Sequence, residues 1–120
     1  MTDPLPTLPE RHTVLRSFAG HLEAGPEAVF NRLVTATASG AAGGGTVHTD
    51  RDRRMVVLRR GWWYRGEYQV LPEDEAGSLV QYEIINVAQV LPWAASWAAA
   101  SVLRAAPRAF QALLTGLSHP

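Results

Sequence analysis

The chain of 120 residues is long enough for one domain with a hydrophobic core, and its 47% hydrophobic and 18% charged residues exclude a disordered protein. Eleven arginines balance eleven acidic residues, so no overall field attracts nucleic acid or an anionic membrane. The absence of cysteine excludes a disulfide framework, a thiolate nucleophile and a zinc–thiolate site. We expect a soluble, cytoplasmic protein.

The first ten residues contain three prolines and no basic region followed by an apolar run, so we do not expect a signal peptide. We expect residues 1–11 to form a flexible tail and residues 12–120 a single domain. The 20 residues from Ile84 to Leu103 carry no charge and are long enough to span a bilayer. Asn86, Gln89 and Pro92 interrupt this segment, so we expect no stable membrane insertion.

Residues 12–24 alternate in polarity and predict a long strand, with Gly20 at a bulge or under a closely packed neighbour. Gly25, Pro26 and Glu27 are typical of a helix start, and an apolar stripe predicts a helix over residues 26–35. The small residues 35–45 include four glycines. Without any lysine they do not form a phosphate-binding P-loop, and we expect a flexible connector.

Residues 46–88 predict an antiparallel meander of four strands. Strands are expected over residues 46–49, 54–60, 62–71 and 78–88, since β-branched and aromatic residues dominate there. Polar or glycine-containing turns separate them at residues 50–53, 60–61 and 72–77. The four strands extend the first strand into a sheet.

The remaining residues predict a long helix from Pro92 to Leu117, with a kink at Pro107 because proline removes one backbone donor. Its apolar side is formed by Ala99, Leu103, Ala106, Phe110, Leu113 and Leu117. An amphipathic helix must cover the apolar face of a sheet, so the order of elements predicts an α+β domain with one long helix across an antiparallel sheet.

Three segments resemble the START-like (SRPBCC) superfamily of helix-grip proteins, in particular its bacterial polyketide cyclase/dehydrase-like branch. They are GHLEAGPEAVFNRL at residues 20–33, GWWYRGEY at residues 61–68 followed by a hairpin into residues 86–88, and the C-terminal helix. Together they cover most of residues 12–117. The family often has seven strands, whereas about five are expected here. The resemblance implies a helix-grip fold that binds an apolar small molecule or lipid between sheet and helix, and some members catalyse polyketide cyclisation.

Strand pairing predicts which side chains face that helix. Pairing Leu71 with Leu79 places Tyr68 opposite Tyr82, and a two-residue turn at residues 60–61 places Arg59 opposite Trp62. The expected inner face comprises Met55, Val57, Arg59, Trp62, Tyr64, Tyr68, Val70, Val80, Tyr82, Ile84 and Asn86. It is apolar with a few polar tips, which is typical of a pocket for a small amphipathic molecule.

Each candidate in this predicted ligand site also has a structural interpretation. Tyr64, Tyr68 and Tyr82 line the pocket or fill the core, and Arg59 belongs to the pocket or to the surface. Asn86 anchors a polar ligand group or caps the turn before the last helix. We expect the opening to lie between these strands and the start of that helix. Trp93 and Trp97 there cover the core or line the opening, unless they form a dimer contact.

The histidines have no metal-ligand spacing, so we expect neither a metal nor another cofactor. Side chains alternate between the two faces of a strand, and His48 is the one histidine whose position in this alternation faces inward. It would act there as a structural residue or as a general base. The leading prediction is binding of a hydrophobic or aromatic small molecule or lipid without catalysis. The alternatives are a cyclase or dehydratase that uses tyrosine and His48 as acid–base groups, and a non-catalytic interaction module that forms a homodimer.

Overall fold

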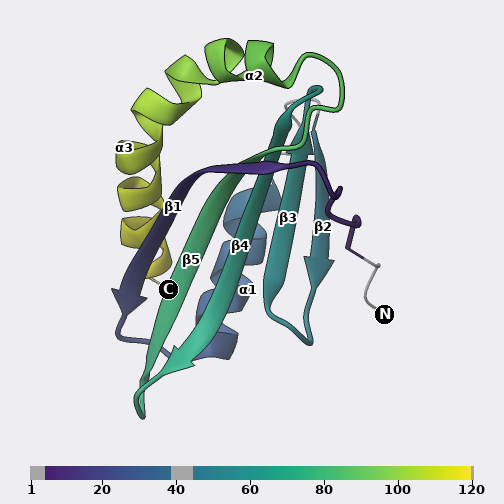
Figure 1. Ribbon diagram of the computed structural model, residues 1–120. Coiled ribbons are helices and arrows are strands. Elements are labelled where there is room, and N and C mark those ends of the chain that lie inside the picture. Colours follow the sequence, from purple (N-terminus) through teal and green to yellow (C-terminus); the bar gives the residue numbers. More distant parts are fainter. Residues whose placement is uncertain (1–4, 39–44, 120) are drawn as a thin grey trace.

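The structure is a computed structural model that describes residues 5–38 and 45–119, apart from the side chain of Ser96. In chain order its elements are β1 (Thr13–Leu22), α1 (Pro26–Ala38), β2 (Thr46–Asp50), β3 (Met55–Arg60), β4 (Tyr64–Glu73), β5 (Gly77–Asn86), α2 (Pro92–Ala98) and α3 (Ala100–Leu117). The strands form one antiparallel sheet in the order β1-β5-β4-β3-β2. Helices α1 and α3 pack on the same face of it (Figure 1). The predicted α+β arrangement is therefore confirmed.

The strand and helix at the start of the domain follow their sequence signals. Helix α1 begins at Pro26 as predicted, with Glu27 in its first turn, and it extends beyond the predicted end to Ala38. Its buried residues Val29, Phe30 and Leu33 face the sheet. Gly20 lies under a neighbour, because a Cβ there would overlap the Leu114 side chain of α3. The predicted glycine-rich connector lies largely outside the described residues, which omit 39–44.

The hairpin of β4 and β5 has the predicted register throughout. Tyr68 pairs with Tyr82, Leu71 with Leu79, and Tyr64 with Asn86. The predicted turn chemistry between the strands sets this register: the Asp74 side chain accepts hydrogen bonds from the backbone N–H groups of Ala76 and Gly77 at 3.1 and 3.0 Å.

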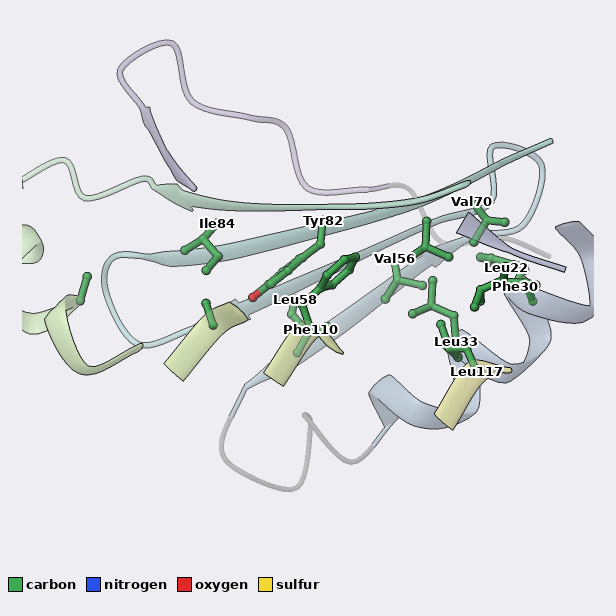
Figure 2. Close-up of a cluster of buried hydrophobic side chains, with 14 of the residues drawn as sticks. Leu22, Phe30, Leu33, Val56, Leu58, Val70, Tyr82, Ile84, Phe110 and Leu117 are labelled. Atoms are coloured by element: carbon green, nitrogen blue, oxygen red, sulfur yellow. The ribbon is translucent and has the colours of Figure 1, made fainter. Parts of the chain in front are cut away.

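The predicted register of β3 against β4 was wrong. The turn contains the three residues 61–63, with Gly61 at φ 60°, and it is closed by the pair Arg60–Tyr64 instead of Arg59–Trp62. An odd shift in register exchanges the two faces of a strand. Val56 and Leu58 consequently belong to the core (Figure 2), while Met55, Val57 and Arg59 face the other side. The same exchange moves His48, the partner of Val57, to the outer face.

The C-terminal helix also differs from its prediction. It is divided at Ala99 into α2 and α3, and α3 continues without interruption through the exposed Pro107. Figure 1 shows that α2 and α3 follow an arc from one end of the sheet down its side. The predicted apolar side is confirmed: Ala99, Ala106, Phe110 and Leu117 are buried, and Figure 2 shows Phe110 and Leu117 directed toward the sheet.

The outer face of the sheet is partly covered as well. Val57 and Ile85 point away from the helices but are 0% and 2% exposed. Figure 1 shows the purple N-terminal segment passing in front of the sheet, on the side opposite α1. Its carbonyl at Arg11 accepts a hydrogen bond of 3.0 Å from the Gln89 amide.

Candidate functional site

A cavity of about 410 Å³ lies between the sheet and the two longer helices. Six residues of α3 line it at helical spacing, and three of them are alanines. The cavity is lined by Ala36 and Thr37 of α1, Leu58 of β3, Tyr68 of β4, Tyr82 of β5, and Val102, Ala105, Ala106, Ala109, Phe110 and Leu113 of α3. Ala106 is buried against the sheet, whereas Ala105 and Ala109 are exposed, so the cavity is open to solvent along this side of α3. A volume of this size accommodates a small organic molecule.

Stacked aromatic rings form the floor of this cavity. The Tyr68 and Tyr82 rings are nearly parallel, at 9°, with centroids 4.3 Å apart. On its other side Tyr82 stacks with Phe18 and with Phe110 of α3, at centroid distances of 6.0 and 5.9 Å. This continuous stack fixes the orientation of the two tyrosine rings and offers a flat apolar surface.

The tyrosine hydroxyl groups are neutral donors and acceptors in this site. Burial is the main cause that raises the pKa values of Tyr64, Tyr68 and Tyr82 above the ordinary range, with further contributions from the neighbouring tyrosines for Tyr68 and Tyr82. Tyr64 and Tyr82 share a hydrogen bond of 2.6 Å between their hydroxyl oxygens. A raised pKa disfavours the phenolate form that a general base would require.

A second hollow of about 390 Å³ lies at the end of the sheet where β3 turns into β4. Its lining is Arg60, Gly61, Trp62, Trp63, Tyr64, Ala98 and Val102. Val102 borders both this hollow and the cavity between the sheet and the longer helices. This hollow includes Trp62 and Tyr64 of the predicted opening but no residue of β5 and neither Trp93 nor Trp97, whereas the cavity of about 410 Å³ lies further along α3.

The structure separates the nine predicted site residues into three groups. Tyr68 and Tyr82 line the cavity between the sheet and the longer helices, and Trp62 and Tyr64 line the hollow. Arg59 and His48, predicted for the inner face, lie on the outer face because of the corrected register. The remaining three, Asn86, Trp93 and Trp97, are at the turn into α2 and on that helix.

Asn86 has a structural partner for each end of its amide. Its Nδ2 donates a hydrogen bond of 3.1 Å to the Pro92 carbonyl, and its Oδ1 accepts one of 2.9 Å from the Ala88 N–H. The side chain is buried and caps the turn between β5 and α2. Of the two roles considered for Asn86, the structure therefore supports the cap.

Several lining residues were missed by the sequence-based prediction. Leu58 was assigned to the wrong face, and Trp63, at 8% exposed, occupies the core position expected for Trp62. Of the α3 residues that line the cavity, Ala106, Phe110 and Leu113 belong to the predicted apolar side, whereas the exposed Val102, Ala105 and Ala109 were not predicted to face inward.

The structure also bears on metal binding and on membrane insertion. Among the described residues no group of three histidine, aspartate or glutamate side chains is placed to hold a metal ion. Within the same part of the chain, no helix has the length and apolar character needed to cross a membrane.

Comparison with known family models and with curated protein sequences finds no match. A solved structure, the crystal structure of TTHA0849 from Thermus thermophilus, is similar in fold, with a TM-score of 0.52 at 16% sequence identity. The similarity covers 85% of this chain and 92% of that one. At this level of identity, it shows the fold alone.

Proposed function

We propose that this protein binds an apolar small molecule, of the lipid or flat aromatic class, in the cavity between sheet and α3. The observation that carries the proposal is the cavity of about 410 Å³ whose walls are alanines on one side and stacked tyrosines on the other. The cavity lies beside the core and is partly open to solvent, since Val102, Ala105 and Ala109 of its lining are exposed, so a ligand could enter it. Apolar walls with one or two polar groups are typical of ligand sites.

The tyrosine chemistry supports binding in preference to catalysis. The neutral Tyr68 hydroxyl can exchange a hydrogen bond with a polar atom of an otherwise apolar ligand. The cyclase alternative has less support, because the tyrosines and His48 lie on opposite faces of the sheet. Acid–base groups must reach the same substrate to act together.

The helix-grip fold of the START-like superfamily is part of this proposal, as is a cytoplasmic location. The resemblance of three sequence segments supports the assignment. An antiparallel sheet, with a short helix after the first strand and a long helix packed across it, agrees with the resemblance. Ligands of that superfamily occupy the space between sheet and helix, which is where the cavity lies.

The test is to fill the cavity without disturbing the fold. We expect Ala109→Leu to abolish binding of the fluorescent aromatic probe N-phenyl-1-naphthylamine and its displacement by dodecanoic acid. Because Ala109 is exposed and borders open space, the larger side chain should not overpack the core, and the variant should retain its melting temperature. Ala100→Leu is the matched control, because it is the same change on α3 outside the cavity.

The outcomes separate binding from simple packing. Binding to the unaltered protein and to the Ala100 variant, together with loss in the Ala109 variant, supports the proposal. Equal probe binding by both variants would mean that the probe occupies another surface. No binding to the unaltered protein by either compound would overturn the proposed ligand class.

A further inference from the structure

Large apolar side chains are exposed together at one end of the molecule. We define the aromatic patch as Trp62, Val90, Leu91, Trp93 and Trp97, all of which are at least half exposed. Trp97 is 84% exposed and Trp93 67%. Figure 1 shows α2 above the end of the sheet, and the hollow that Trp62 shares with Ala98 joins the β3–β4 turn to this helix. The patch therefore combines two segments that are distant in sequence.

Helix α2 exposes its large apolar residues and buries a small one, the reverse of the usual arrangement. Ala95 is fully buried, whereas Trp93 and Trp97, one turn apart on the same side, point to solvent. A tryptophan buries far more apolar area than an alanine, so a helix that serves only its own core places the tryptophans inward. The arrangement indicates that an apolar partner covers the outer side of α2.

The charges on the elements that carry and follow the patch favour one partner. From Ile84 onward the sequence has no aspartate or glutamate, while α3, the helix that follows α2, carries the exposed Arg104 and Arg108. The exposed Arg60 lines the hollow beside Trp62. Tryptophan and arginine together are characteristic of proteins at the interface of a bilayer, where arginine pairs with anionic headgroups.

A second copy of the chain fits this surface less well. A symmetric dimer places the same patch on itself, which brings Arg60 of one copy toward Arg60 of the other. No acidic residue on α2 or α3 compensates for this repulsion. An anionic lipid surface supplies both the apolar region for the tryptophans and the opposite charge.

We propose that the aromatic patch docks this protein onto the surface of a bilayer that contains anionic lipids. The tryptophans enter the headgroup region while the rest of the domain remains in water. Trp93 and Trp97 do not line the cavity, so the proposal stands independently of the proposed ligand site. Val102, which borders both the cavity and the hollow near the patch, connects the two regions.

Vesicle co-sedimentation tests the proposal with the full chain. We expect binding to phosphatidylcholine vesicles that contain phosphatidylglycerol, with a blue shift of tryptophan emission, and weaker binding at high salt. The double variant Trp93→Ala/Trp97→Ala should bind on the order of tenfold or more weakly. Its melting temperature should be unchanged, because both side chains are exposed. Val14→Ala, which removes an exposed apolar side chain outside the patch, is the control.

A second pair of variants tests the charge. Arg104→Gln/Arg108→Gln should reduce binding to the anionic vesicles, whereas Arg53→Gln, at the turn between β2 and β3, should not. Equal binding by the tryptophan double variant and the unaltered protein would overturn the proposal. A dimer in light scattering that the tryptophan variant converts to monomer, without vesicle binding by either, would assign the patch to a second copy instead.

Discussion

The hydroxyl oxygens of Tyr64 and Tyr82 lie 2.6 Å apart, although the two residues are not opposite each other in the sheet. Tyr64 pairs with Asn86, and Tyr82 pairs with Tyr68 four residues further along β4. Tyr64 reaches its partner because its ring lies across Gly66, where a Cβ would overlap it. The glycine in the segment Tyr64–Tyr68 thus permits a contact that any other residue would obstruct.

Gly66→Ala should therefore destabilise the protein by about 1–3 kcal/mol, the usual cost of overpacking a well-packed site. Urea denaturation measures this change. In a Tyr64→Ala background the same substitution should cost much less, because the obstructing ring is absent. An equal cost in both backgrounds would show that the ring of Tyr64 is not what the new methyl group meets.

The three tyrosines of the chain, Tyr64, Tyr68 and Tyr82, all belong to this cluster, so an ultraviolet titration of phenolate absorbance reports on it alone. Burial raises their pKa values in the folded protein, so little phenolate should form at pH about 10, where free tyrosine is half ionised. Since the folded pKa exceeds the unfolded one, the resulting stability is fully present below pH about 10. It is lost as the pH rises further.

The expected titration is a single steep rise in absorbance that coincides with unfolding by circular dichroism. A Tyr82→Phe variant should keep this coincidence for the remaining two tyrosines. A gradual rise with a midpoint at the ordinary value, in a protein that remains folded, would contradict the enclosed arrangement of these rings.

The sequence was sufficient to predict the β4–β5 hairpin, because both strands alternate regularly and the turn between them has strong local signals. The β3–β4 hairpin shows where this reasoning fails. Trp62 and Trp63 have strand-forming side chains, yet Trp62 belongs to a turn and Trp63 enters the core from it. Propensity alone does not set the length of a turn, and one odd change in register reversed the predicted face of Arg59 and His48.

The position of the cavity depended on information that is not local. The apolar side of α3 was predicted correctly, but the cavity also borders the exposed Ala105 and Ala109 beside it, and the space there depends on how far the helix lies from the sheet. That distance is set by contacts elsewhere, such as Leu114 against Gly20. Periodicity identifies which residues face inward, and only packing decides how much space remains between them.

His21 should respond to pH through two carboxylates. Its Nε2 lies 3.0 Å from Glu23 and its Nδ1 3.0 Å from Glu73. Hydrogen bonding to Glu23, then to Glu73, raises the pKa of His21 above its ordinary value despite an opposing effect of burial. The imidazolium contribution to stability is fully present below pH about 6.5 and is lost as the pH rises through the folded pKa.

Glu23→Gln should consequently lower the pKa of His21, as measured by the NMR shift of its ring protons across the titration. Glu10→Gln, which changes an exposed carboxylate that does not contribute to this shift, should leave that pKa unaltered. An unchanged His21 titration in the Glu23 variant would show that the carboxylate does not hold the imidazolium in solution.

The ion pair of Arg65 and Glu67 lies on the outer face of β4 and is almost enclosed, with side chains 4% and 17% exposed and 2.7 Å between Arg65 Nε and Glu67 Oε2. Glu67→Ala should destabilise the protein by about 3–5 kcal/mol in urea denaturation, because it leaves a buried guanidinium unpaired. Replacing both residues, as in Arg65→Met/Glu67→Leu, should recover most of that loss. Glu83→Gln is the control: it changes the carboxylate opposite Glu67 and, by removing like-charge repulsion, should not destabilise. A small cost for Glu67→Ala would mean that water reaches the Arg65 guanidinium.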